Sequence, residues 1–332
     1  AGGGFLGTGI VIDEAGDDFY RTGAISQGAG LFGVGILIDD AGSDTYEATD
    51  FVQGAGMFGL GLMYDGGTEN DIYSGTLYAQ GAALTGGLGI CLNRGGNENY
   101  YAGGAHQDFP RWPEHTLSLS QGCAFGMRPD ASGGIAFLGD YAGNDIYTSE
   151  VFGQGVGYWY ALGMLFDREG HDWYQLHQYG QGSGIHLATG ALIDVTGIDR
   201  YNSWALAQGT GHDFGVGCWL DMEGHDFMLG NDICQGIGHF NSVGLAIDLA
   251  GDDFWGGRSI GNNQGWVNPL RDYGAVGVLL DIQGSDVYNI PGHADGLIWT
   301  EPNGGIGYDV DAPPDIAPLQ WLREERMGGE AK

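Results

Sequence analysis

Two sets of acidic residues recur along the chain at a fixed spacing. The pattern Asp-x-x-Gly-x-Asp-x-Tyr occurs ten times, with some degenerate copies, and supplies one aspartate at its first position and one at its sixth. Carboxylate oxygens are ligands that calcium prefers in proteins, so the chemistry that this pattern predicts is cation binding. The candidate metal ligands are Asp13, Asp18, Asp39, Asp44, Asp65, Asp71, Asp140, Asp145, Asp167, Asp172, Asp194, Asp199, Asp221, Asp226, Asp248, Asp253, Asp281 and Asp286.

The spacing of the copies predicts the architecture that positions these residues. Consecutive first aspartates are 26 or 27 residues apart over most of the chain, which marks a repeat protein. Each unit holds short apolar runs such as Gly-Ile-Leu-Ile at 35–38, followed by a turn, and lacks the long period of an amphipathic helix. We therefore predict an all-β fold, a single right-handed parallel β-helix of about eleven coils.

We predict one repeat domain over 1–311, with loop insertions near 102–120 and 256–276, and a tail at 312–332. The tail contains Pro313 and Pro314, then a short stretch with helical amphipathic character, so we expect it to cap the open end of the solenoid.

Stacking turns each repeat position into a column of neighbouring side chains. Equivalent residues of successive coils lie about 4.8 Å apart, so each carboxylate has like-charged neighbours above and below. Two such charges repel by roughly 1 kcal/mol in bulk water and roughly 3.5 kcal/mol at an effective dielectric constant of 20. Either each aspartate accepts hydrogen bonds from the main chain of its own turn, or a divalent cation neutralises the column. The sequence leaves both solutions open.

The turns resemble part of a known calcium-binding repeat. Gly-Ser-Asp-Thr-Tyr at 42–46, Gly-Asn-Asp-Ile-Tyr at 143–147 and Gly-Ser-Asp-Val-Tyr at 284–288 are similar to the second half of the RTX nonapeptide. The likeness is partial, because an RTX roll has two nonapeptides in each short coil and this chain has one such turn per unit. The resemblance implies calcium as the bound ion and no organic cofactor.

Two further columns are interpreted as structural. A glutamine followed by glycine, as at Gln53 and Gln154, recurs in each unit, and we expect the stacked amides to hydrogen-bond along the solenoid axis. The tyrosines that end the repeats, such as Tyr46 and Tyr147, are expected to form a stacked packing ladder. Cys91, Cys123, Cys218 and Cys234 have no Cys-x-x-Cys spacing and are interpreted as buried thiols.

The two insertions are where we look for a binding or catalytic site, because loops on a rigid scaffold often carry function. An aromatic ring suits a sugar face, an arginine suits a uronate, and histidine with an acid suits proton transfer. A solvated loop covering the edge of a coil would explain the same residues. The catalytic candidates of the first insertion are His106, Asp108, Arg111 and His115, and the ligand-binding candidates of the two insertions are Trp112, Trp266 and Arg271.

Charge limits the choice of partners. The chain has 43 acidic residues against 11 Lys plus Arg, a net charge of −32, which argues against nucleic acid and favours divalent cations. No apolar run is long enough for a transmembrane segment. Because the chain opens inside a repeat, at 1–9, we expect a trimmed N-terminus and an extracellular or cell-surface location.

From these observations we predict a non-enzymatic function. The chain is expected to be a rigid, acidic, calcium-stabilised scaffold that binds polysaccharide or a neighbouring surface protein. One alternative is a polysaccharide lyase or glycoside hydrolase whose site lies in the 102–120 insertion, because parallel β-helices often carry glycan chemistry. Another is a structural subunit of a larger assembly.

Overall fold

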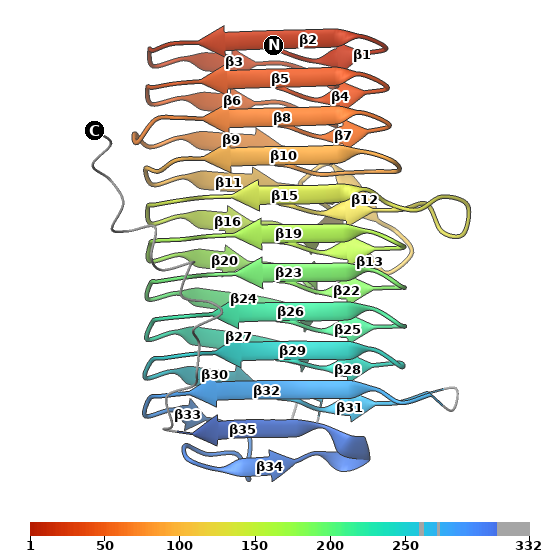
Figure 1. Cartoon of the computed structure of the whole chain (residues 1–332), viewed down its shortest axis with the longest axis vertical. Coiled ribbons are helices and arrows are strands. Elements are labelled where there is room, and N and C mark those ends of the chain that lie inside the picture. The colour runs from red at the N-terminus through yellow and green to blue at the C-terminus, as the bar shows by residue number, and fades with distance from the viewer. Residues whose placement is uncertain (259–261, 271–272, 311–332) are drawn as a thin grey trace, which may run out of the picture.

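The computed structural model describes residues 1–258, 262–270 and 273–310. These residues form a β-solenoid of about eleven turns made of stacked parallel strands, which confirms the predicted fold class (Figure 1). No helix within the described residues is long and apolar enough to cross a membrane. The predicted cap at 312–332 lies outside them.

Each coil contributes a strand to a first sheet, here sheet 1, whose strands lie one above another in Figure 1. Inward and outward side chains alternate along them, as in β5, where Gly35, Leu37 and Asp39 are buried. The last strand pair is antiparallel and closes the sheet. Sheet 1 consists of β2 (Thr8–Asp13), β5 (Val34–Asp39), β8 (Leu60–Asp65), β10 (Leu88–Asn93), β15 (Ile135–Gly139), β19 (Leu162–Phe166), β23 (Thr189–Ile193), β26 (Val216–Asp221), β29 (Val243–Asp248), β32 (Val276–Ile282), β35 (Ile306–Val310) and β34 (Ile298–Thr300).

A second sheet, sheet 2, follows the Asp-x-x-Gly-x-Asp turn in each coil. It consists of β3 (Phe19–Arg21), β6 (Thr45–Glu47), β9 (Ile72–Gly75), β11 (Asn99–Ala102), β12 (His106–Asp108), β13 (Trp112–Leu117), β16 (Ile146–Thr148), β17 (Val151–Gly153), β20 (Trp173–Gln175), β21 (Gln178–Gly180), β24 (Arg200–Ala207), β27 (Phe227–Cys234), β30 (Phe254–Gly257) and β33 (Val287–Tyr288). The first insertion adds the antiparallel pair β12 and β13 to this sheet.

Short strands after the glutamines form the third side of the solenoid, in two sheets that isolated bridges at Ala83 connect. They are β1 (Gly4–Phe5), β4 (Gly30–Leu31), β7 (Gly56–Met57), β14 (Ala124–Phe125), β18 (Gly157–Tyr158), β22 (Gly184–Ile185), β25 (Gly211–His212), β28 (Gly238–His239) and β31 (Val267–Asn268). One 3-10 helix, η1 (Pro302–Gly304), lies near the C-terminal end of the described chain.

The tyrosine ladder is the centre of the hydrophobic core, as predicted. Rings of neighbouring coils stack nearly parallel, with centroids 4.6 Å apart for Tyr73 and Tyr100 and 4.8 Å apart for Tyr147 and Tyr174. Apolar side chains of sheet 1, such as Leu165, pack against these rings. The four cysteines are free, and three of them are buried, which agrees with their interpretation as thiols.

The glutamine column is structural, but its hydrogen bonds differ from the prediction. Gln154 has a φ of 54°, which turns its side chain inward, and its Nε2 donates to the carbonyls of Tyr147 and Gln175, both at 3.0 Å. The amides therefore tie main chains of adjacent coils together and do not bond to one another. The glycine that follows, Gly155, has a φ of 76°, and a Cβ there would lie 2.1 Å from the carbonyl oxygen of Ala191.

Candidate metal centre

The turn between sheets 1 and 2 brings two aspartates of each coil to the same corner. The first ends a strand of sheet 1, as Asp39 ends β5, and the second directly precedes a strand of sheet 2, as Asp44 precedes β6. The turn needs its glycine, because Gly143 has a φ of 152° and a Cβ there would lie 1.8 Å from the carbonyl oxygen of Gly96. We number the coils 1 to 11 by their first-position residues, Asp13, Asp39, Asp65, Asn93, Asp140, Asp167, Asp194, Asp221, Asp248, Asp281 and Asp309.

First-position aspartates receive a hydrogen bond from the tyrosine ladder. The hydroxyl of Tyr147 donates to Oδ2 of Asp167 at 2.6 Å, and the hydroxyl of Tyr174 donates to Oδ2 of Asp194 at 2.7 Å. The predicted capping within the turn also occurs in some coils, as at Asp140, whose Oδ1 accepts from the amide of Ala142. The tyrosines therefore position the first-position carboxylates as well as forming the core, which the regular tyrosine pattern in the sequence did not reveal.

Second-position aspartates bond across coils. Oδ1 of Asp172 accepts from the main-chain amide of Asp145 at 2.6 Å, and Oδ1 of Asp199 accepts from the amide of Asp172 at 2.6 Å. The sequence predicted bonds within each residue's own turn. The structure differs because the stacked corners place each amide closer to the carboxylate of the next coil.

The two columns converge into groups of three acidic side chains, each made by one first-position residue and two second-position residues. In each group the three donor atoms lie within 4.8 Å of one another. Five such groups are Asp18 with Asp39 and Asp44, Asp44 with Asp65 and Asp71, Glu98 with Asp140 and Asp145, Asp145 with Asp167 and Asp172, and Asp172 with Asp194 and Asp199. The groups of coils 2 and 3 share Asp44, and those of coils 5 to 7 share Asp145 and Asp172, so these five groups form two rows, one on each side of coil 4.

The groups of coils 6 and 7 contain carboxylate oxygens that are buried and have no hydrogen-bond partner. In coil 6 these are Oδ2 of Asp145, Oδ1 of Asp167 and Oδ2 of Asp172. In coil 7, Oδ1 of Asp194 and Oδ2 of Asp199 complete the same arrangement with Asp172. A buried carboxylate oxygen without a partner costs free energy, so these oxygens require a cation or a proton.

Burial makes the charged form of these groups unfavourable. Burial first, and then the charge of neighbouring carboxylates, raise the pKa of Asp71 to about 8, that of Asp145 to about 9 and that of Asp172 to about 10. The same cause raises the pKa of Asp167 and Asp199 well above the ordinary aspartate value. At neutral pH the metal-free column would therefore hold many of its protons.

The donor set fits a calcium ion. Two oxygens bound to one ion at about 2.4 Å can be at most about 4.8 Å apart, and the three oxygens of each group satisfy that limit. The groups offer carboxylate oxygen alone, without nitrogen or sulfur, which suits calcium better than zinc or copper. In coils 6 and 7 the residues that would hold the ion are the three acids of each group.

Coil 4 departs from the pattern, since Asn93 occupies its first position. Its Nδ2 donates to the hydroxyl of Tyr73 at 3.0 Å and to Oδ2 of Asp71 at 3.4 Å, while its Oδ1 accepts from the amide of Gly95 at 2.6 Å. The side-chain amide of Asn93 thus donates a hydrogen to the carboxylate of Asp71 and carries no charge of its own.

Both columns reach the described ends of the solenoid. Asp13 and Asp18 in coil 1 are only partly buried because no coil covers them in the structure, whereas Asp281 and Asp286 are buried. The sequence reading missed Asp309, which pairs in register with Asp281 and is buried. The sequence signal that could have identified it is the Gly-x-Gly-x-Asp pattern that leads up to Asp309. This copy lacks the turn sequence that follows the first aspartate in other repeats.

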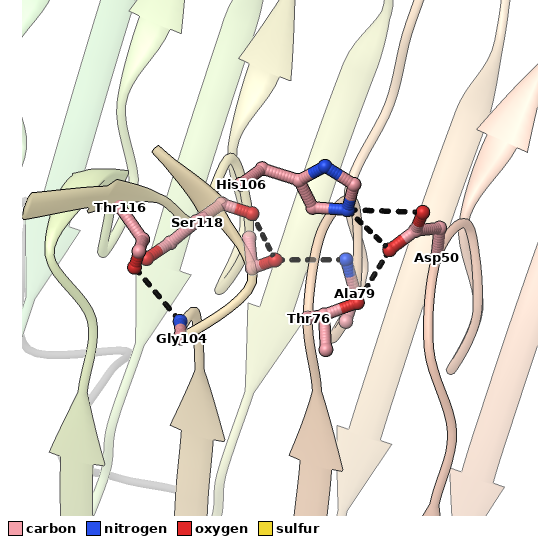
Figure 2. A network of polar contacts seen from close by, with 8 residues as sticks. Asp50, Thr76, Ala79, Gly104, His106, Thr116 and Ser118 are labelled. Atoms are coloured by element: carbon pink, nitrogen blue, oxygen red, sulfur yellow. Dashed lines mark hydrogen bonds and ion pairs between the residues drawn. The ribbon is translucent and has the colours of Figure 1, made fainter. Parts of the chain in front are cut away.

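The first insertion places His106 away from the other catalytic candidates. Nε2 of His106 lies 3.0 and 3.1 Å from the two carboxylate oxygens of Asp50, in coil 2. Figure 2 shows the imidazole reaching across to Asp50, whose Oδ1 also accepts from the hydroxyl of Thr76. Ser118, on the same insertion, donates to the carbonyl of Ala102. This network fastens the insertion to the earlier coils.

Asp108 and Arg111 pair with each other. Nε and Nη2 of Arg111 donate to the buried carboxylate of Asp108 at 2.8 and 3.0 Å, and the guanidinium lies 4.9 Å from the centroid of the Phe152 ring. This bidentate pair packs against the apolar surface and leaves the carboxylate without free oxygens, as expected for a structural contact.

His115 and Trp112 meet a histidine that the sequence reading had not selected. The rings of His115 and His177 stack with centroids 3.6 Å apart, and Trp112 meets the edge of His177. Nε1 of Trp112 also donates to Oε1 of Gln178 at 2.5 Å. The four catalytic candidates thus divide among three sets of partners. A comparison of the outward positions of sheet 2 from coil to coil could have identified His177 in the sequence.

The second insertion is described in part. Trp266 is partly buried, and its ring centroid lies 6.3 Å from that of His239. Arg271 lies outside the described residues.

No family model matches this chain, and neither the curated proteins nor the solved structures include a significant match.

Proposed function

We propose that this protein is a rigid extracellular or cell-surface scaffold whose coils are held together by calcium ions bound along the aspartate columns. The observation that carries the proposal is the set of buried, partnerless carboxylate oxygens of Asp145, Asp167 and Asp172 in coil 6, repeated by Asp172, Asp194 and Asp199 in coil 7. A cation shared by three such groups offsets both their burial and their mutual repulsion.

The ion links neighbouring coils as well as neutralising charge. Each group draws one second-position aspartate from the coil before, so a bound ion would connect two turns of the solenoid. Sites of this kind in extracellular calcium modules bind at roughly 10⁻⁴ to 10⁻³ M, which suits a protein that experiences calcium outside the cell. A calcium-filled column would stiffen a scaffold that presents its flanks to polysaccharide or to a neighbouring protein.

The enzymatic alternative has weaker support. A glycan-processing site would need His106, Asp108, Arg111 and His115 to converge, but His106 binds Asp50, Asp108 binds Arg111, and His115 stacks on His177. Asp108 and Arg111 satisfy one another and have little capacity left for proton transfer.

Thermal unfolding with and without a chelator tests the proposal. Protein treated with EDTA and dialysed at about pH 8 should unfold at a much lower temperature than protein in millimolar calcium, and added calcium should restore the midpoint. Magnesium at the same concentration is the control, since it prefers a smaller octahedral site. Equal midpoints in EDTA and in calcium would refute the proposal and leave the columns stabilised by protons and main-chain hydrogen bonds.

A further inference from the structure

The outward side of sheet 2 carries an unusual set of side chains in coils 6 to 8. Three strands lie in register there, so that Trp173, Arg200 and Phe227 form one outward row, and Gln175, Asn202 and Leu229 form the next. Further along, the Trp204 ring stacks on His177 at a centroid distance of 6.1 Å. We call this surface the coil 6–8 face: Trp173, Gln175, His177, Arg200, Asn202, Trp204, Phe227 and Leu229.

The face is hollowed by two adjoining depressions. One of about 750 Å³ is lined by Trp173, Arg200 and Phe227 among others, and one of about 280 Å³ is lined by His177, Trp204 and others. Asn202 lines both, so the two depressions adjoin over strand β24, and we refer to the pair as the groove. A groove of this size can hold a short chain of sugar rings.

Its aromatic residues are exposed, although the solenoid core could have buried rings of the same type. Trp173 is 47% exposed, Trp204 40% and Phe227 40%. Trp173 and Phe227 are two coils apart, about 9.6 Å along the axis, a distance that two linked sugar rings can span. Exposed, rigid aromatic faces at such a spacing are suited to stack on the apolar faces of sugars.

The polar groups of the face are arranged for hydroxyl and carboxylate groups. Nδ2 of Asn202 donates to Oε1 of Gln175 at 2.8 Å, which fixes both amides and leaves Nε2 of Gln175 and Oδ1 of Asn202 without a partner among the described residues. Arg200 is exposed and makes no ion pair within the described part of the chain. Arg258 lines the smaller depression.

Arg200 gives the coil 6–8 face a positive charge that is available to an anionic ligand. The whole chain has 43 acidic and only 11 basic residues, yet the eight outward positions of the coil 6–8 face include an unpaired arginine and no acid. Glu150 lines the smaller depression, and Asp252 lines the larger one together with the column residues Asp199, Asp226 and Asp253, whose side chains are buried. In coil 1 the outward arginine of the neighbouring column, Arg21, is already paired with Glu47 at 3.4 Å.

We propose that the coil 6–8 face binds an acidic oligosaccharide, with sugar rings stacked on Trp173, Phe227 and Trp204 and a uronate carboxylate held by Arg200. The inference rests on the scaffold function proposed above, because it names the ligand class that the scaffold would present or adhere to. It does not depend on calcium, since none of the eight side chains belongs to the aspartate columns.

The test is titration calorimetry of the full chain, in constant calcium, with oligogalacturonates and with neutral cello-oligosaccharides of the same length. Trp173→Ala and Trp204→Ala should each weaken oligogalacturonate binding by about tenfold or more, as loss of a central aromatic contact does. Arg200→Gln should weaken binding of the oligogalacturonate and leave any binding of the neutral sugar unchanged. Phe19→Ala and Arg21→Gln, at the same two outward columns of coil 1, are the matched controls and should bind normally.

Two results would overturn the inference: no binding of the oligogalacturonate, or equal binding by wild type, Trp173→Ala and Trp204→Ala. Preferred binding of the neutral oligosaccharide would overturn the role given to Arg200. Each variant is first unfolded by heat in calcium, and an unchanged midpoint shows that it is folded. If calcium has no effect on unfolding while Trp173→Ala still loses oligogalacturonate, the metal proposal fails and this one stands.

Discussion

Coils 4 and 7 fill the same corner of the solenoid with different chemistry. In coil 4, Asn93 donates an amide hydrogen to Asp71 and is electrically neutral. In coil 7, Asp194 accepts from Tyr174 and Tyr201 through Oδ2, at 2.7 and 3.0 Å, while its Oδ1 is buried without a partner. The amide supplies its own hydrogen, whereas the carboxylate depends on a cation or a proton from solvent.

The comparison distinguishes what the turn needs in order to form from what the carboxylates add. Asn93 pairs in register with Asp65 on the neighbouring strand of sheet 1. A carboxylate at this position is therefore not needed to form the turn. Carboxylates recur in the other coils although their burial is costly. Selection for a bound ion explains that recurrence better than turn capping does, because asparagine caps the turn equally well.

Replacing the first-position aspartates of coils 6 and 7 with asparagine, the residue found in coil 4, should produce the largest change in calcium-dependent stability. The double substitution Asp167→Asn with Asp194→Asn removes the first-position ligand from two groups. At calcium concentrations about 100 times the dissociation constant, two lost sites should reduce the calcium-dependent stabilisation by about 5 kcal/mol. Chemical unfolding with and without calcium measures the difference.

Asp40→Asn is the matched control for that variant. Asp40 is exposed and lies in the same turn, directly after Asp39. It should leave the calcium-dependent stabilisation unchanged. If the double variant responds to calcium as wild type does, the carboxylates of coils 6 and 7 are not ligands.

The metal-free protein should lose stability as pH rises. Burial raises the pKa of Asp71 to about 8, of Glu98 to about 9 and of Asp172 to about 10, above their values in the unfolded chain. The folded state therefore binds these protons more tightly, and that stabilisation is complete below about pH 4 and is lost as pH rises through 8 to 10.

We expect the unfolding midpoint of EDTA-treated protein to fall by roughly 5 to 10 °C between about pH 5 and pH 9. Calcium should oppose that fall, because the deprotonated columns bind it more strongly. A midpoint that rises with pH in the absence of metal would show that the carboxylates are stabilised as anions by the protein itself. Differential scanning calorimetry across the pH series makes the measurement.

The reverse substitution, Asn93→Asp, gives coil 4 the chemistry of coil 7. It places a third carboxylate between Asp71 and Glu98, both of which are buried. Metal-free protein should become less stable at about pH 8, and the calcium-dependent stabilisation should grow by about 2.7 kcal/mol when calcium is about 100 times the dissociation constant. Asn97→Asp, at an exposed position of the same turn, is the control. If Asn93→Asp responds to calcium as wild type does, the proposed explanation of the difference between coils 4 and 7 is wrong.

The smallest effect is expected from the tyrosine hydroxyls. Asp167 receives one phenol hydrogen bond, from Tyr147, whereas Asp194 receives two, from Tyr174 and Tyr201. Tyr147→Phe should therefore cost about 1.5 to 3 kcal/mol, and Tyr174→Phe less than that. Urea unfolding of the two variants in calcium compares them directly, and equal losses would mean that the hydroxyls act through packing alone.

Much of this fold could be predicted from the sequence because the repeat is strict. The period fixes coil length, apolar runs such as 35–38 mark the strands, and the tyrosines mark the core. What could not be predicted depends on how the corners stack. No sequence pattern shows that Asp172 bonds to the amide of Asp145, one coil away, or that the two converge with Asp167.

The insertion residues illustrate the same limit. His106 and His115 lie close together in the sequence, yet they contact different parts of the solenoid, Asp50 and His177. Those partners lie on other segments of the repeat, and a local motif cannot identify them. The coil 6–8 face was also missed, because its residues belong to three strands and to the segment between β20 and β21, and only the register brings them together.

The most direct test of the account is a count of bound calcium by equilibrium dialysis at about pH 8, in wild type, in the Asp167→Asn, Asp194→Asn double variant and in Asn93→Asp. We predict several ions per wild-type chain, fewer in the double variant and more in Asn93→Asp. The same count in all three proteins, or no bound calcium at millimolar concentration in wild type, would contradict the claim that the aspartate columns are a metal centre.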